Sequence, residues 1–184
     1  MTFIWSDIET NGDPDPETGH ILEVGFFLTE SKPPFRFLGS VGYVIEAPVS
    51  YQEVMHSMPP EVRAMHEKSG LTTLLSHPGI PQPLATAELE CIELISRFVE
   101  DGDGIMAGRG ISWFDRPWIQ IQMPKLYKKF HPRTYLDLTQ VRRFFQFAEI
   151  DILELDESMP HRATVDAEYH YNEFINYKNQ IQLR

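Results

Sequence analysis

The sequence predicts an α/β fold in which helices pack on a mixed five-stranded sheet. Two observations support this prediction. Three strand-like segments follow one another at the start of the chain, and helical segments then alternate with two short strand-like segments. In folds of this class, functional side chains gather at the ends of strands and in the loops beyond them.

The first three strands are expected to form an antiparallel meander. Residues 2–8 begin it, and residues 20–30 and 35–47 follow, both rich in β-branched and aromatic side chains. The short SKPP segment between the last two suits a tight turn. Two shorter strands are predicted at 104–110 and 134–138.

Helices are indicated by apolar residues at helical spacing and by proline or glycine at the ends. Prolines begin the first helical segment and Gly70 ends it, while Leu89, Ile92 and Ile95 give the second an apolar face. Pro117 falls in the first turn of the third, where proline is tolerated. The predicted helices are 59–70, 86–101, 114–123, 139–148 and 163–181.

Length and composition predict a single domain over residues 1–184. Hydrophobic residues make up 42% of the chain, which is ample for a core. The sequence has neither an apolar run of membrane-spanning length nor a secretory signal, and its one cysteine, Cys91, excludes an internal disulfide and a thiolate zinc cluster. We therefore expect a cytoplasmic protein that does not act at a membrane.

The net charge of −11 argues at first against nucleic acid as a partner. However, residues 109–143 contain eight of the 16 basic residues and only two acids, Asp115 and Asp137. A basic segment in an acidic protein could contact a polyanion. The other interpretation, a solvated helix face, is favoured on charge alone.

Asp7 and Glu9 stand at the end of the first predicted strand. Side chains at positions i and i+2 of a strand share a face, so both carboxylates should point the same way. Two like charges so close are unfavourable unless a cation lies between them, and carboxylates suit Mg²⁺ or Mn²⁺. A solvated strand edge is the favoured interpretation when the pair is considered alone.

Two further acidic motifs occur later in the chain. Asp115 opens the predicted helix 114–123, where an N-cap is the ordinary role for aspartate. His161 is the only one of seven histidines with an aspartate, Asp166, five residues on. A surface histidine and a helix-start aspartate are the ordinary interpretation of this pair.

Together these residues form an ordered set: Asp-x-Glu on the first strand, Asp before a mid-chain helix, and His-x4-Asp on the last helix. The set resembles the DEDDh group of 3′–5′ exonucleases, which have a ribonuclease H-like fold. Within that group the stretches FIWSDIETNGDPD, HEKSGL, RTYLDL and HRATVDA resemble oligoribonucleases. Ribonuclease T and the proofreading subunits of bacterial DNA polymerases are more distant members.

The resemblance implies a metal-dependent exonuclease that releases nucleoside 5′-monophosphates from single-stranded RNA or short oligonucleotides. Asp7, Glu9 and Asp166 would hold one divalent ion, and Asp7 with Asp115 the second. Either Mg²⁺ or Mn²⁺ would serve, in a two-metal-ion mechanism. His161 would be the catalytic base, since its ordinary pKa suits proton transfer near neutral pH.

Substrate-binding roles are implied for Thr10, His66 and Arg133, with Arg133 reaching the substrate of the partner subunit in a homodimer. Oligoribonucleases bracket a dinucleotide with a leucine and a tryptophan, whereas here Asp13 and Pro60-Glu61 stand at those positions. A strict dinucleotide preference is therefore not predicted. Trp113, Phe114, Met65 or His66 could stack on bases instead, although packing roles are favoured for all four.

Three other functions remain open from the sequence. The chain could be a single-stranded DNA exonuclease similar to proofreading enzymes. It could also be a non-catalytic nucleic-acid-binding subunit with the same fold, although such a protein should have lost at least one of the five site residues. A third possibility is a protein that binds one ion for stability only.

Overall fold

The computed structural model describes residues 1–153, 155 and 160–182. Its centre is a sheet with the strand order β4-β3-β2-β1-β5-β6. The described strands are β1 (Thr2–Thr10), β2 (Ile21–Glu30), β3 (Phe37–Glu46), β4 (Gln82–Pro83), β5 (Gly104–Gly108) and β6 (Phe130–Asp137). The predicted α/β class is confirmed. The sheet has six strands instead of five because β4 adds two residues to its edge.

The sheet is mixed, as predicted. Strands β1, β2 and β3 pair in an antiparallel meander, whereas β5 runs parallel to β1 and β6 runs parallel to β5. Strand β1 is therefore central, with β2 on one side and β5 on the other. Such a strand is covered by helices on both faces, so its polar residues have a structural or functional reason to be there.

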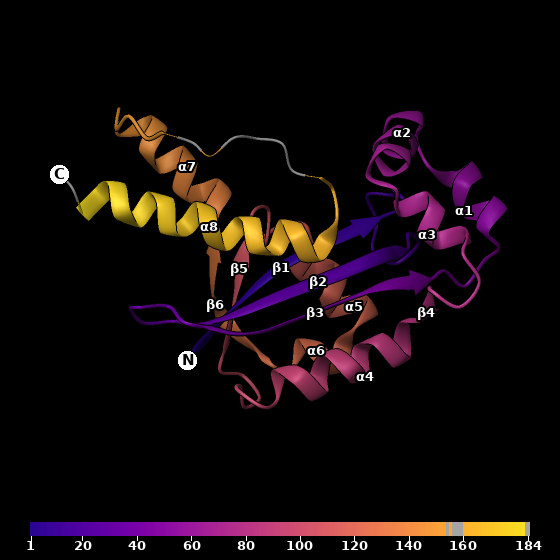
Figure 1. The fold of residues 1–184 in the computed structure, drawn as a ribbon, viewed down its shortest axis with the longest axis horizontal. Coiled ribbons are helices and arrows are strands. Elements are labelled where there is room, and N and C mark those ends of the chain that lie inside the picture. Colours follow the sequence, from indigo (N-terminus) through magenta and orange to yellow (C-terminus); the bar gives the residue numbers. More distant parts are fainter. Residues whose placement is uncertain (154, 156–159, 183–184) are drawn as a thin grey trace.

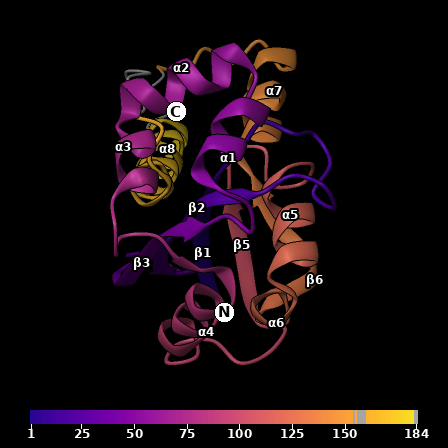
Figure 2. The same ribbon diagram turned by 90° about the vertical axis from the view of Figure 1, so that its right-hand side faces the viewer.

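Helices cover both faces of the sheet (Figure 1). Helices α7 and α8 lie on one face, and α4, α5 and α6 lie on the other. Figure 2 looks onto the end of the sheet where α1, α2 and α3 gather. The helices are α1 (Tyr51–Ser57), α2 (Pro60–Ser69), α3 (Leu71–Ser76), α4 (Leu84–Ile95), α5 (Asp115–Gln122), α6 (Pro124–Tyr127), α7 (Leu138–Phe147) and α8 (Ala163–Gln182).

Most predicted elements lie within a few residues of the observed ones. The clearest errors concern α4, which ends at Ile95, six residues before the predicted end at residue 101, and β6, which begins at Phe130, four residues before the predicted start at residue 134. The prediction also missed α1, α3 and α6, which are only 7, 6 and 4 residues long. Helices this short show too little periodicity to be recognised. None of the helices in the described part of the chain is long and apolar enough to cross a membrane.

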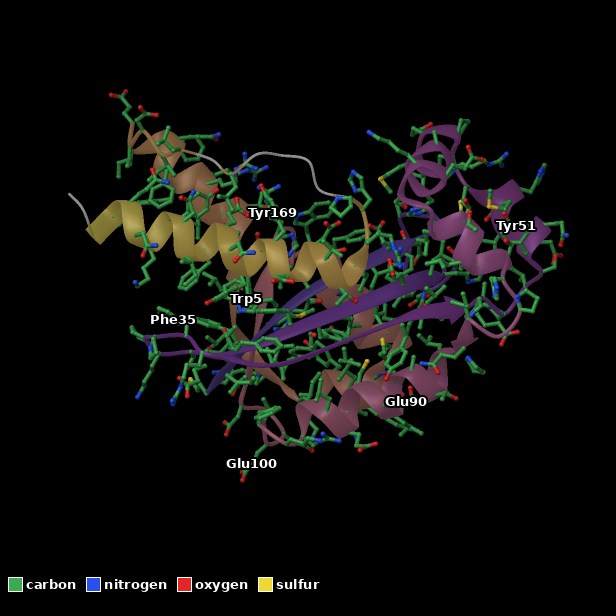
Figure 3. All side chains as sticks on the ribbon, in the orientation of Figure 1. Trp5, Phe35, Tyr51, Glu90, Glu100 and Tyr169 are labelled. Carbon is green, nitrogen blue, oxygen red and sulfur yellow. The ribbon has the colours of Figure 1, made fainter. Side chains whose placement is uncertain are left out.

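The two faces of β1 pack against different layers. Ile4 and Ile8 belong to the main apolar core on the α4 side. Trp5 lies between the sheet and α8, where it packs with Ala167, Tyr171 and other α8 side chains (Figure 3). Because side chains alternate along a strand, the face that carries Trp5 continues with Asp7 and Glu9. The two carboxylates therefore face the beginning of α8.

Two glycines allow α8 to approach the sheet closely. Gly25 on β2 pairs directly with Asp7 on β1 and with Gly42 on β3. A Cβ at Gly25 would overlap the backbone of Ala163 and Thr164, and one at Gly42 would overlap the Thr164 hydroxyl. The first turn of α8 thus occupies the space that two side chains would otherwise fill.

Gly25→Ala should consequently destabilise the protein by about 1–3 kcal/mol, because the added methyl meets backbone that cannot move aside without shifting α8. Gly39→Ala on β3 is the matched control, since a Cβ there makes only ordinary contacts with Leu94. Urea unfolding of both variants measures the difference. Equal stability of the two variants would contradict the close packing of α8 on Gly25.

Candidate active site

The C-terminal end of β1, the first turn of α8 and helix α2 surround a pocket of about 590 Å³. Asp7, Glu9 and Thr10 contribute from β1, and His161 and Asp166 from the start of α8. The opposite wall is largely apolar. It consists of Val62 and Met65 from α2 and of Trp113 and Phe114 from the segment before α5. The pocket therefore combines acidic groups with an apolar surface.

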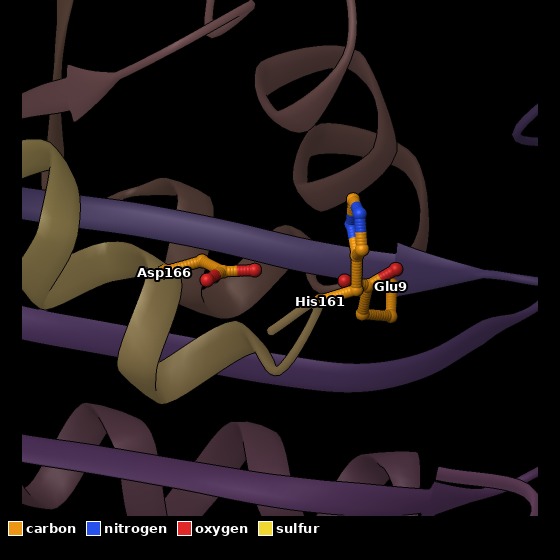
Figure 4. Close-up of side chains that lie close together, drawn as sticks. All are labelled: Glu9, His161 and Asp166. Carbon is orange, nitrogen blue, oxygen red and sulfur yellow. The ribbon is translucent and has the colours of Figure 1, made fainter. Parts of the chain in front are cut away.

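Three of the predicted residues come close enough to share one cation. One ligand atom from each of Glu9, His161 and Asp166 lies within 4.8 Å of the other two (Figure 4). Asp166 is buried, and its Oδ2 accepts a hydrogen bond of 3.1 Å from the Arg162 backbone. Its Oδ1 is buried without a hydrogen-bond partner in the described part of the chain. A buried carboxylate oxygen without a partner is unfavourable unless another group binds it.

Asp115 begins α5, but its side chain does not cap that helix, so the N-cap interpretation is wrong. Its Oδ1 instead accepts a hydrogen bond of 3.3 Å from the Ser6 hydroxyl on β1. This contact joins α5 to the strand that carries Asp7. Asp115 is buried, and after desolvation its charge is the largest cause that raises the pKa of Asp7.

Burial and repulsion from neighbouring carboxylates raise the pKa of all four carboxyl groups. Desolvation is the largest cause for each of them, and for Asp7 the charges of Asp115 and Glu9 add to it. The pKa of Glu9 is raised to about 8, and that of Asp115 also to about 8. The pKa of Asp166 is raised to about 6. A group of acids under this repulsion is stabilised by positive charge.

These observations fit a hard divalent cation. The negatively charged donor atoms are carboxylate oxygens, which suit Mg²⁺ or Mn²⁺ better than softer metals. The unpartnered Oδ1 of Asp166 provides a free ligand atom beside Glu9 and His161. The arrangement can therefore hold positive charge next to a pocket that opens to solvent.

Thr10 and His66 meet at the end of β1. The Nε2 atom of His66 lies 2.8 Å from the Thr10 carbonyl oxygen, which can only accept, so Nε2 carries the hydrogen. Its Nδ1 therefore carries no hydrogen, and it lies 3.8 Å from Glu9 Oε2. Burial lowers the pKa of His66, which keeps the ring neutral. His66 has no exposed surface on which a base could stack, and it fixes the Glu9 end of the strand from inside.

Arg133 lies outside this pocket. It is exposed on β6, the strand at the edge of the described sheet. Elsewhere in the basic segment 109–143, Arg109 pairs with Glu173 at 2.8 Å and Lys129 with Asp101 at 2.6 Å. Arg116 donates to the backbone carbonyls of residues 131 and 132. Several of these bases thus stabilise the fold, and the segment is not a continuous surface for phosphates.

The four candidates for base stacking differ in exposure. Trp113 is 68% exposed, so the favoured packing interpretation is wrong for this residue. Phe114 and Met65 are partly buried and still reach the pocket. The packing interpretation is correct for His66, which is completely buried. Trp113 is therefore the candidate with the most free ring surface.

Sequence reasoning missed two residues that build the site, Glu23 and Arg162. Glu23 lies directly opposite Glu9 in the β1–β2 pair and is buried. Arg162 binds Glu23 through Nη2 at 2.7 Å. Glu23 is placed beside Glu9 by the regular β1–β2 register, which runs from Thr2–Glu30 to Glu9–Glu23 and which the strand pattern alone does not reveal.

The curated proteins that match this chain are oligoribonucleases. It is 28% identical over 182 residues to oligoribonuclease of Nocardia farcinica, a match that covers 95% of this chain and 78% of that protein. It is also 28% identical over 180 residues to oligoribonuclease of Rhodococcus jostii, covering 96% of this chain and 85% of the relative. No protein-family model matches the sequence.

Solved nuclease structures share the fold. E. coli exonuclease I in complex with a 5cy-dT13 oligonucleotide superposes with a TM-score of 0.63 at 15% identity. That match covers 97% of this chain but only 40% of exonuclease I. Cell-death related nuclease 4 superposes with a TM-score of 0.64 at 11% identity, covering 98% of this chain and 64% of that protein.

The sequence comparisons confirm the predicted resemblance to oligoribonucleases and support the prediction of a 3′–5′ exonuclease. The structural neighbours, at such low identity, bear on the fold alone. They agree with the α/β architecture that places the carboxylates at the end of the central strand.

The raised pKa values predict how stability depends on pH and metal. The folded protein binds these protons more tightly than the unfolded chain, so the carboxyl groups favour folding at low pH. This contribution is lost as the pH rises above about 4. The loss is complete above about pH 6 for Asp166 and above about pH 8 for Glu9. Since metal ligands must be deprotonated, Mn²⁺ should raise Tm by at least about 5 °C at pH 8 and by less at pH 5.

Thermal unfolding with EDTA and with Mn²⁺ at the two pH values measures this effect. Asp166→Asn is the control, because it removes one negative ligand and should reduce the increment at pH 8. An equal increment at both pH values, or none at pH 8, would contradict a metal site built from these carboxylates.

Proposed function

We propose that this relative of oligoribonucleases degrades single-stranded RNA or short oligonucleotides from the 3′ end by a two-metal-ion mechanism, releasing nucleoside 5′-monophosphates. The observation that carries the proposal is the convergence of Glu9, His161 and Asp166 within 4.8 Å, at the edge of a pocket with an apolar wall. We also propose that residues 1–184 act as one exonuclease domain in the cytoplasm.

Asp7, Glu9 and Asp166 would hold one divalent ion, and Asp7 with Asp115 the second. When bound, such ions polarise the scissile phosphate, favour ionisation of the attacking water and stabilise the leaving 3′-oxygen. The carboxylates would also keep these positive charges at the end of β1, next to the apolar wall. Asp115 fits this role because its contact with Ser6 holds it against the same strand.

His161 would accept the proton of the attacking water. It is exposed at the start of α8 and lines the pocket beside Asp166, so solvent reaches it. The new bond forms between the water oxygen and phosphorus while the bond from phosphorus to the 3′-oxygen breaks. The 3′-oxygen then takes a proton from solvent, and His161 returns its own proton to solvent.

Two observations bear on the kind of nucleic acid. The curated relatives are called oligoribonucleases, which supports RNA as the substrate. The exonuclease I structures contain dT13 and dA13 oligonucleotides, which supports single-stranded DNA as the second candidate. The wall formed by Val62, Met65 and Trp113 suits the faces of bases, which RNA and DNA share.

A comparison of three substrates in Mn²⁺ tests this proposal. We expect stepwise loss from the 3′ end of a 5′-labelled 24-mer RNA, faster than from a 24-mer DNA of the same sequence. A dinucleotide should not be preferred strongly, because Asp13 and Pro60-Glu61 replace the bracketing residues. Faster loss of DNA would favour the second candidate, and no 3′-terminal loss from any substrate would favour a non-catalytic subunit.

Three variants assign the roles within the site. Asp7→Ala and Asp166→Ala should abolish cleavage, since each removes a metal ligand. His161→Ala should lower kcat by about 10²–10⁴-fold while Mn²⁺ binding, measured by calorimetry, is retained. Loss of Mn²⁺ binding in His161→Ala would make His161 a ligand, and an unchanged kcat would exclude it as the base.

We also propose a homodimer formed through β6 and α7. Strand β6 has an unpaired outer edge in the described sheet. The exposed apolar residues nearby are Tyr135 at 44%, Phe144 at 61% and Phe147 at 86%. Exposed aromatic residues in such number are typical of interaction surfaces. Arg133 lies on the same strand and would reach toward the site of the partner.

Phe147→Glu should shift the protein from dimer to monomer, because it puts a charge into the proposed apolar interface. Light scattering coupled to size-exclusion chromatography measures the mass. Leu89→Glu on α4 is the control, since Leu89 is 55% exposed on the other side of the sheet and should leave the mass unchanged. A wild-type monomer at micromolar concentration would contradict the proposal.

A further inference from the structure

We propose that Arg162 is a positioning residue, which through its ion pair with Glu23 holds His161 over the carboxylate cluster. This inference rests on the proposed function. It concerns a contact between β2 and the residue that precedes α8.

The ion pair is extensive and largely shielded from solvent. Arg162 Nε lies 3.1 Å from both carboxylate oxygens of Glu23, and Nη2 lies 2.7 Å from Oε1. The backbone N–H of Ala163 adds a hydrogen bond of 3.0 Å to Glu23 Oε2. A bidentate arginine pair fixes geometry as well as charge. Glu23 therefore anchors both the arginine and the first residue of α8 to the sheet.

Arg162 also contacts the catalytic cluster directly through its backbone. Its N–H donates to Asp166 Oδ2 at 3.1 Å, so one residue joins Glu23 on β2 to Asp166 on α8. Glu23 itself lies opposite Glu9 in the strand pair. Without the guanidinium, two like charges would face each other across β1 and β2, which is unfavourable.

His161, the residue immediately before Arg162, needs such an anchor. Its φ is +53°, a left-handed conformation that a residue with a side chain adopts only when its surroundings impose it. Within the described residues, no hydrogen bond to another side chain holds its imidazole ring. The direction of the ring therefore follows from the backbone, and the backbone is fixed on its C-terminal side by Arg162.

The inference predicts that Arg162 acts through His161. Lysine keeps the positive charge but cannot form the bidentate pair, so Arg162→Lys should lower kcat by at least about tenfold and leave KM within about twofold. In a His161→Ala background, Arg162→Lys should cost less than twofold, because residues that act as a unit are not additive. Glu23→Gln should show the same dependence on His161.

The matched control is the pair between Arg36 and Glu30, at the far end of β2. Arg36 binds Glu30 through Nε at 3.1 Å and Nη2 at 2.7 Å, but its side chain is 72% exposed. Arg36→Lys should leave kcat and KM unchanged. Urea unfolding and Mn²⁺ calorimetry of each variant show whether it folds and binds metal like the wild type, as we expect for Arg162→Lys.

Three results would overturn the inference. The first is an equal loss of kcat from Arg162→Lys in both backgrounds. The second is a rise in KM with kcat unchanged, which would make Arg162 a phosphate-binding residue. The third is a fall in kcat that matches a fall in Mn²⁺ affinity. If the wild-type protein cleaves no substrate, the proposed function fails instead, so the two failures are distinguishable.

Discussion

The close approach of the first turn of α8 to the sheet is the constraint on which the site depends. Gly25 and Gly42 leave no side chains beneath this turn, and Ala163 fills the space. Only at this distance can Asp166 reach the acids of β1. The apolar part of α8 enforces the same register, because Tyr171 and Phe174 pack on Trp5. The packing of the apolar part of α8 thus places Asp166, in the first turn of the helix, beside the carboxylates of β1.

The close approach of α8 to the sheet holds several carboxylates together in a buried site, which is electrostatically unfavourable. Desolvation raises the pKa of Asp7, and four neighbouring carboxylates raise it further. The apolar contacts along β1 and α8 offset that cost and keep the acids together when no cation is present. Arg162 is the described cation that acts on both Glu9 and Asp166, and its main partner is Glu23. The cluster is thereby left available for positive charge from outside the chain.

The sequence predicted what depends on local pattern. Strand alternation placed Asp7 and Glu9 on one face, and helical periodicity placed the start of α8 at residue 163. It did not predict what depends on contacts between distant segments. In the sequence, nothing distinguishes Gly25 from an ordinary strand glycine. Its role is to make room for a helix that begins some 140 residues later in the chain. Asp115 looked like an N-cap because the Ser6 hydroxyl that binds it comes from another element.

The two walls of the pocket are built differently, and this separates chemistry from substrate choice. The acidic wall belongs to the central strand and to a helix packed on it, so a change there disturbs the core. The apolar wall comes from α2 and the segment before α5, where Trp113 is mostly exposed. Substitution there costs little stability. Replacement of the bracketing residues by Asp13 and Pro60-Glu61 is therefore compatible with an unchanged set of acids. Under the proposed function, the recognition of bases would shift to Trp113 while the reaction stays the same.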